Sequence, residues 1–182
     1  IRAKACLFAA QKKVAKRILP QLSEEQKYAM GKIHYRAYLV MNVLLKDKVP
    51  AQGYDVFLLR GAKPYSAIRE ADKRMAADVI YADWASDGGG QSSVLTFYIP
   101  RAYQGAEQFL FPPGAHDKYR DKAMELMPGW LEMLGLSMRD VVGTRMTRWG
   151  HAMPVAARGL IKSGVLCAAH APMADKIYFA GQ

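Results

Sequence analysis

The apolar positions of this chain fall into short stretches that predict β-strands. Residues 35–45 form the longest stretch, rich in Tyr, Val and Leu and free of breaking residues, and predict a long strand. Pro50 and Gly53 lie in a turn, after which residues 54–59 predict a returning strand. Further strands are expected over residues 6–10, 77–84, 93–99, 141–149 and 177–181.

Two helices are predicted in the first part of the chain. Residues 12–19 have helical or turn character and stop before a proline. Ser23 and Gln26 have the spacing of a capping box, in which each side chain binds a free backbone N–H, and a helix should follow to about Lys32.

Helical spacing returns in the second half. Apolar residues recur every three or four positions over residues 115–134, where Pro128 is expected to kink or divide the helix. Shorter helices are expected over residues 67–75 and 155–163, and the three glycines at 88–90 predict a hairpin or loop.

Together these elements predict the fold class. Strands that follow one another through turns favour antiparallel pairing, and the intervening helices need a sheet face to cover. We therefore expect an α+β fold, a largely antiparallel mixed sheet with helices packed on one face.

Composition narrows the class of protein. Of the 182 residues, 51% are hydrophobic, which argues against disorder, and no uninterrupted apolar stretch is long enough to cross a bilayer. Cys6 and Cys167 lie far apart in apolar surroundings, so buried free thiols are expected. Metal-ligand spacing is not found, and His34, His116 and His170 have no nucleophile or carboxylate at suggestive spacing. No metal site and no catalytic residue is predicted.

The net charge of +10 raises the possibility of an anionic partner. Lys12, Lys13, Lys16 and Arg17 form the densest basic group, while the other basic residues alternate with acids. Because no nucleic-acid-binding motif frames them, a solvated basic face is the interpretation, and no nucleic-acid partner is expected. The three glycines at 88–90 lack the Lys and Ser/Thr of a phosphate-binding loop.

Three segments, in this order, carry a resemblance to a known family. Residues 5–11 read Ala-Cys-Leu-Phe-Ala-Ala-Gln, residues 148–154 read Arg-Trp-Gly-His-Ala-Met-Pro, and residues 177–181 read Ile-Tyr-Phe-Ala-Gly. This order resembles the flavin-containing amine oxidase family, in which a strand ending Phe-Ala-Gly returns to the FAD. The family strand that corresponds to residues 5–11 usually ends Ala-x-Pro, and Gln11 departs from that pattern.

The resemblance implies a domain organisation. Residues 1–20 would hold the end strand of an FAD-binding domain that is otherwise missing, residues 21–150 the substrate-binding domain, and residues 151–182 the return segment. The glycine-rich turn that holds the FAD pyrophosphate is absent from this chain. The expected partner is therefore a missing N-terminal FAD-binding portion, and a homodimer is a further expectation. A cytoplasmic location is favoured, with export left open.

The resemblance also implies the residues that would bind the cofactor. Trp149 would pack beside the isoalloxazine ring, and Gly150 would allow close passage. Ala180 and Gly181 would approach the FAD through their backbone, where missing side-chain bulk permits close contact, and Ala9 would lie near the nucleotide.

The resemblance indicates the substrate-binding residues less specifically than the cofactor-binding residues. Tyr38, Tyr98 and His151 would line the cavity for a small-molecule amine or another reduced compound. Tyrosines in strands more often pack within a sheet, and an isolated histidine is more often a structural hydrogen-bonding residue. Two alternatives to a flavin enzyme stay open, a stand-alone basic α+β module that binds an anionic ligand and a non-catalytic scaffold.

Overall fold

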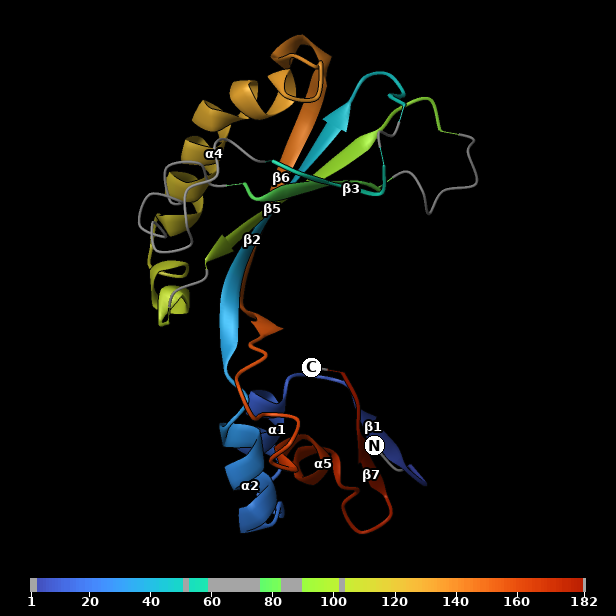
Figure 1. Ribbon diagram of the computed structural model, residues 1–182, viewed down its shortest axis with the longest axis vertical. Coiled ribbons are helices and arrows are strands. Elements are labelled where there is room, and N and C mark those ends of the chain that lie inside the picture. The colour runs from blue at the N-terminus through green and yellow to red at the C-terminus, as the bar shows by residue number, and fades with distance from the viewer. Residues whose placement is uncertain (1–2, 51–52, 59–75, 83–89, 102–103, 182) are drawn as a thin grey trace. The chain divides into compact units, whose positions relative to one another are not determined.

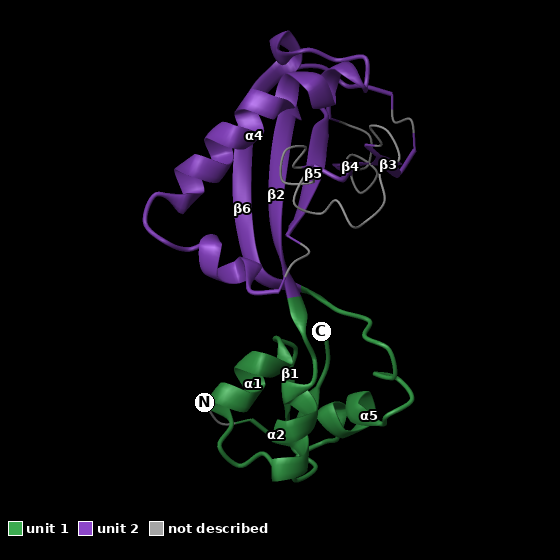
Figure 2. Ribbon diagram, turned by 60° about the vertical axis from the view of Figure 1, so that its left-hand side comes forward, with its two compact units in different colours: residues 1–35, 153–182 green, residues 36–152 purple. Residues whose placement is uncertain are grey.

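The computed structural model describes residues 3–50, 53–58, 76–82, 90–101 and 104–181 (Figure 1). The chain divides into two compact units, one of residues 1–35 and 153–182 (unit 1) and one of residues 36–152 (unit 2) (Figure 2). The predicted fold class is confirmed, a mixed α+β fold with a five-stranded antiparallel sheet and helices.

Unit 2 is built on the five-stranded sheet, whose strand order is β3-β4-β5-β2-β6. The elements are β2 (Tyr35–Leu45), β3 (Asp55–Phe57), β4 (Asp78–Tyr81), β5 (Val94–Arg101), the 3₁₀ turn η3 (Ala106–Phe109), α4 (Ala115–Glu132), η4 (Met138–Asp140) and β6 (Val141–Pro154). β2 runs antiparallel to β5, and β4 runs antiparallel to both β3 and β5. The long strand predicted over residues 35–45 is confirmed with these bounds.

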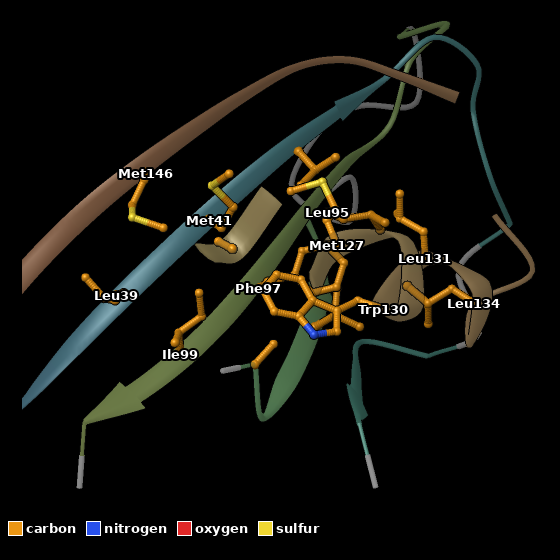
Figure 3. Packing of buried hydrophobic residues seen from close by; sticks show 14 of the residues in the cluster. Leu39, Met41, Leu95, Phe97, Ile99, Met127, Trp130, Leu131, Leu134 and Met146 are labelled. Atoms are coloured by element: carbon orange, nitrogen blue, oxygen red, sulfur yellow. The ribbon is translucent and has the colours of Figure 1, made fainter. Parts of the chain in front are cut away.

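One face of this sheet carries the core of unit 2. Alternate residues of the strands are buried, as the two-residue period of a strand requires, and they meet α4 (Figure 3). The ring of Phe97 lies 5.3 Å from that of Trp130, centre to centre. The labelled core residues are Leu39, Met41, Leu95, Phe97, Ile99, Met127, Trp130, Leu131, Leu134 and Met146.

Unit 1 joins segments from the beginning and the end of the chain. It contains β1 (Cys6–Phe8), α1 (Lys12–Ile18), α2 (Glu24–Gly31), α5 (Val165–His170) and β7 (Ile177–Phe179). β1 pairs with β7 in parallel, and this pair forms a separate two-stranded sheet. Its core consists of Ala15, Leu22, Ala29, Met30, Ile33, Tyr35, Ala169 and Phe179.

The second half of the chain departs from the sequence pattern at two helices. Pro128 was expected to kink or divide its helix; the helix is not divided, because α4 continues past Pro128 to Glu132. Pro128 is exposed, and the buried Met127 and Trp130 beside it hold the helix against the sheet, which outweighs one missing hydrogen bond. Residues 155–157 have no regular structure, residues 158–163 form turns, and the helix begins only after Gly164, whose φ of 74° is left-handed. The helix expected over residues 67–75 lies outside the described residues.

Smaller predictions were also corrected. Ser23 accepts a hydrogen bond from the Gln26 N–H at 3.1 Å, which confirms the helix cap, but the Gln26 side chain donates to the Ala171 carbonyl at 2.8 Å instead of closing a capping box. Cys6 and Cys167 are exposed rather than buried, because β1 has only β7 as a partner and Ala169 faces the core in α5. Within the described ranges, no helix has both the length and the apolar character needed to cross a membrane.

The core of unit 2 predicts that replacing two phenylalanines of the same sheet by Ala has very different effects on the free energy of unfolding. Replacing Phe97, which has no exposed surface, by Ala should lower the free energy of unfolding by about 3–5 kcal/mol, since it leaves a cavity against Trp130. Phe57→Ala is the matched control, because Phe57 is 65% exposed and should cost less than about 1 kcal/mol. Denaturant unfolding of both variants measures the difference, and equal losses would contradict this description of the core.

Candidate functional site

The ends of β1 and β7 bring Ala9 and Gly181 together. Phe8 pairs with Phe179 in the parallel ladder, and the Ala180 N–H donates to the Phe8 carbonyl at 3.0 Å. Gly181 follows with a left-handed φ of 70°, and a β-carbon on it would lie 2.9 Å from the Ala9 carbonyl oxygen. Only glycine therefore fits at this position without a shift of the backbone. The structure thus places three of the residues selected from sequence, Ala9, Ala180 and Gly181, at one point of unit 1.

A buried lysine lies behind this point. Lys12, at the start of α1, has no exposed surface, and its Nζ donates to the carbonyls of Ala180 at 2.7 Å and Gly181 at 3.2 Å. Burial lowers the pKa of Lys12. The prediction of a solvated basic face is wrong for Lys12, because the helical period places it on the inner side of α1 with Ala15. It holds for Lys13, Lys16 and Arg17, which are exposed.

A cavity of about 610 Å³ lies in unit 1 beside Gly181. Its wall is mostly apolar and comes from the turn segment after β6 and from α5; it includes Ile33, Val155, Leu160, Ile161 and Leu166. The lining also includes Lys162, His170 and Gly181. The His170 Nδ1 lies 2.8 Å from the Leu166 carbonyl oxygen and Nε2 lies 3.4 Å from that of Gly181. No nucleophile or carboxylate was expected beside His170, and both of these partners are backbone carbonyls, one in its own helix and one after β7.

The second group of candidates lies on the face of the unit 2 sheet opposite α4. Tyr38 and Tyr98 alternate with the buried residues of β2 and β5, and their rings meet edge to face at 5.2 Å. Trp149 and His151 alternate along β6 with residues that face η3 and α4, so they share the face of the two tyrosines. Trp149 is 53% exposed. All four residues selected from sequence in this region therefore lie on one face.

Gly150 and Arg148 lie on the other side of β6. The Arg148 Nη1 donates to the Leu110 carbonyl at 2.7 Å, and its guanidinium lies 5.5 Å from the centre of the Phe111 ring. A β-carbon on Gly150 would lie 2.8 Å from Cε2 of Phe111. The absent side chain of Gly150 thus makes room for Phe111, and this contact could not be recognised from the sequence, where the two residues are 39 positions apart (150 − 111).

Two carboxylates lie on the face that carries the tyrosines, those of Asp78 in β4 and Asp55 in β3. Asp78 in β4 is paired with Tyr98 in the ladder, and its Oδ1 is buried without a hydrogen-bond partner among the described residues. Burial, reinforced by the charge of Asp55, raises the pKa of Asp78 to about 6. Burial, with contributions from Asp78, Tyr98 and Asp55, raises the pKa of Tyr38 to about 12. Asp78 was not selected from sequence, although a carboxylate inside an apolar strand was a usable signal.

The site has no metal-binding group of side chains. Across the described part of the chain, no set of three His, Cys, Asp or Glu side chains could hold a metal ion. The described residues instead form a turn of small residues backed by a buried ammonium in unit 1, and a sheet face in unit 2 that carries tyrosines next to two carboxylates.

Comparisons with known proteins identify the fold. No protein-family model and no curated protein matches this chain. Among solved structures, a candidate protoporphyrinogen oxidase from Exiguobacterium sp. 255-15 matches 98% of the chain with 14% identity and a TM-score of 0.53. Reduced UDP-galactopyranose mutase matches 98% with 11% identity and a TM-score of 0.60. Cyclohexylamine oxidase from Brevibacterium oxydans IH-35A matches 100% with 13% identity and a TM-score of 0.55.

These likenesses show a shared fold. The chain spans 36% of the length of the first two proteins and 37% of the third, so it corresponds to about a third of each. The fold is thus that of a part of two oxidases and of a mutase that was determined in its reduced form.

The contact of Gly150 with Phe111 predicts a position-specific effect along β6. Gly150→Ala should lower the free energy of unfolding by about 1–2 kcal/mol, because the new methyl group displaces the Phe111 ring. Gly143→Ala in the same strand has nothing within 4 Å of its β-carbon and should be neutral or slightly stabilising. Chemical denaturation distinguishes the two variants, and an unchanged stability for Gly150→Ala would refute the contact.

The raised pKa of Asp78 predicts a pH dependence of stability. A carboxyl whose pKa rises on folding favours the folded state in its protonated form, so its contribution falls as pH rises from about 4 to about 6. Asp78→Asn should therefore match the wild type near pH 4 and exceed it at pH 7.5 by about 1–2 kcal/mol, a value reduced for partial hydration. Unfolding curves across this range measure the effect, with the exposed Asp47→Asn as the control for lost charge. A variant that is less stable than the wild type at pH 7.5 would contradict the assignment.

Proposed function

We propose that this chain is the substrate-side portion of an FAD-dependent oxidoreductase of the amine oxidase type. The observation that carries the proposal is the approach of Gly181 to Ala9 at the end of the paired strands β1 and β7. The flavin-containing amine oxidases, which the sequence resembles, use the corresponding Phe-Ala-Gly strand to reach their cofactor. The fold likeness to an amine-oxidising enzyme over the whole chain supports the same assignment.

The residues of unit 1 fit a cofactor. Gly181 has no side chain to block a ligand, and among the described residues none accepts a hydrogen bond from its N–H. The adjoining cavity is largely apolar, with Lys162, His170 and Gly181 as its polar residues, which is the usual composition of a cofactor pocket. In this proposal, residues 1–20 and 151–182 adjoin an FAD-binding portion supplied by the rest of the protein.

The residues of unit 2 fit a wall over the flavin. Trp149 presents an exposed ring on the open face of the sheet and would pack beside the isoalloxazine. Gly150 would act through Phe111, since its missing side chain fixes that ring against β6 and leaves Trp149 directed to the opposite face. FAD, when bound, supplies the hydride acceptor, so the chain itself has to orient the substrate and exclude water.

The two carboxylates beside the tyrosines favour an amine as the substrate. Asp78 and Asp55 disfavour further negative charge next to Tyr38 and Tyr98, and the same field attracts a protonated amine. Tyr38, Tyr98 and His151 would contact the substrate. This preference is local to the two carboxylates, because strand alternation places Arg36 and Arg145 on the same face. The homodimer stays a prediction from sequence.

The test uses the full-length protein and two matched glycine variants. The wild type should purify yellow and release FAD on denaturation. Gly181→Ala should bind FAD at least about tenfold more weakly, because the strained φ and the contact with Ala9 displace the turn. Gly135→Ala, with a φ of 72° and nothing within 4 Å, carries the same backbone strain away from the site and should bind FAD as the wild type does.

The outcomes separate the proposal from its alternatives. A colourless full-length protein that takes up no FAD would refute it, and salt-sensitive binding to nucleic acid or acidic lipids would then favour the anionic-ligand module. A yellow protein in which both glycine variants bind FAD like the wild type would refute the placement of the cofactor at Gly181.

A further inference from the structure

Lys12 has a feature that the proposed function leaves unexplained. A lysine is almost never fully buried unless it is paired, yet Lys12 has no exposed surface. Its ammonium is satisfied by two backbone carbonyls from the far end of the chain, those of Ala180 and Gly181. The lysine and the turn after β7 therefore depend on each other, because loss of the ammonium removes the donor from the Ala180 carbonyl and leaves the Gly181 carbonyl with only the 3.4 Å contact of His170.

The two hydrogen bonds fix the orientation of a peptide plane. In a planar trans peptide the N–H points opposite to the C=O. Since the Ala180 carbonyl points at Lys12, the N–H of Gly181 in the same peptide points away from Lys12. That N–H donates to none of the described residues, and Gly181 lines the cavity of unit 1. Lys12 thus holds a free donor in a set direction.

Glycine needs such an external constraint more than any other residue. With no β-carbon, Gly181 can adopt left-handed and right-handed conformations at similar cost, so its own geometry does not hold the turn. His170 also approaches the Gly181 carbonyl, but at 3.4 Å, whereas the Lys12 ammonium makes the shorter, charge-assisted contacts at 2.7 and 3.2 Å. The positive charge also polarises both peptides, which makes the N–H of Gly181 a stronger donor.

We propose that Lys12 is a positioning residue for the cofactor, which fixes the Ala180–Gly181 turn so that the Gly181 N–H donates to an oxygen of bound FAD. This inference rests on the proposed function. Lys12 itself touches only the protein, and its effect on the cofactor passes through the two carbonyls that it holds.

The experiment measures FAD affinity and folding stability separately in the full-length protein. The variants are Lys12→Met, which keeps the apolar stem and removes the donors, Lys12→Arg, which keeps charge and donors, and Lys13→Met, which removes one exposed charge from the same helix. For each, the Kd for FAD is measured by titration of the apoprotein well below its melting temperature, together with the visible spectrum of the bound flavin and the melting temperature.

If Lys12 positions the cofactor turn, Lys12→Met should raise the Kd for FAD at least about tenfold and alter the flavin spectrum. The Kd of Lys12→Arg should stay within about threefold of the wild-type value. The Kd of Lys13→Met should equal that of the wild type. If Lys12 had only a structural role, the Lys12→Met variant would have a lower melting temperature but an unchanged Kd for FAD, and that result overturns the inference.

Should Lys12→Met fail to fold, a folded Lys12→Arg with a Kd for FAD raised tenfold overturns the inference as well. A wild type that binds no FAD refutes the proposed function and this inference together, whereas FAD binding by the wild type with an unchanged Lys12→Met refutes the inference alone.

Discussion

Unit 1 depends on a pairing between two strands at opposite ends of the chain. Cys6 is in register with Ile177, 171 positions away (177 − 6), and the sheet has only these two strands. Two strands alone are marginal in water, so the pairing needs support from elsewhere. The support comes from Phe179, which is buried with residues of α1, α2 and α5, and from the two hydrogen bonds of Lys12. The pairing of β1 with β7 and its supporting contacts therefore set the geometry of the candidate cofactor turn, Ala180–Gly181.

Much of the fold could be predicted because local pattern and tertiary packing agree. Residues 35–45 alternate between sheet faces throughout and match β2 residue for residue, and the Ser23 cap begins α2 as expected. The failures occur where packing or backbone conformation overrides composition. Pro128 is tolerated because its missing donor lies on the exposed side of a well-packed helix, and the glycines at 159 and 164 take left-handed angles that interrupt an otherwise helical composition.

The candidate site was predictable only where a residue type has one physical use. Small residues after an apolar strand signal a close backbone approach, and Gly181 and Ala9 make one. Lys12 carried no such signal, because it lies in a group of basic residues that is typical of a solvated helix face. Its two carbonyl acceptors come from a turn far along the sequence. The same holds for Phe111, which reaches Gly150 only after the chain has folded back on β6. Such contacts join residues that are far apart in the sequence, and the local pattern of apolar and polar residues does not predict them.

The interrupted layout of unit 1 has a consequence for synthesis on the ribosome. Unit 2 is one continuous stretch of chain, and it emerges complete before the residues that finish unit 1 are made. Domains generally fold as units during translation, so we expect unit 2 to fold as an insertion while Leu22, Met30 and their neighbours still lack the partners that α5 and β7 supply. The nascent chain would then expose an apolar surface for the time that synthesis of the last segment takes, which is the kind of surface that molecular chaperones bind.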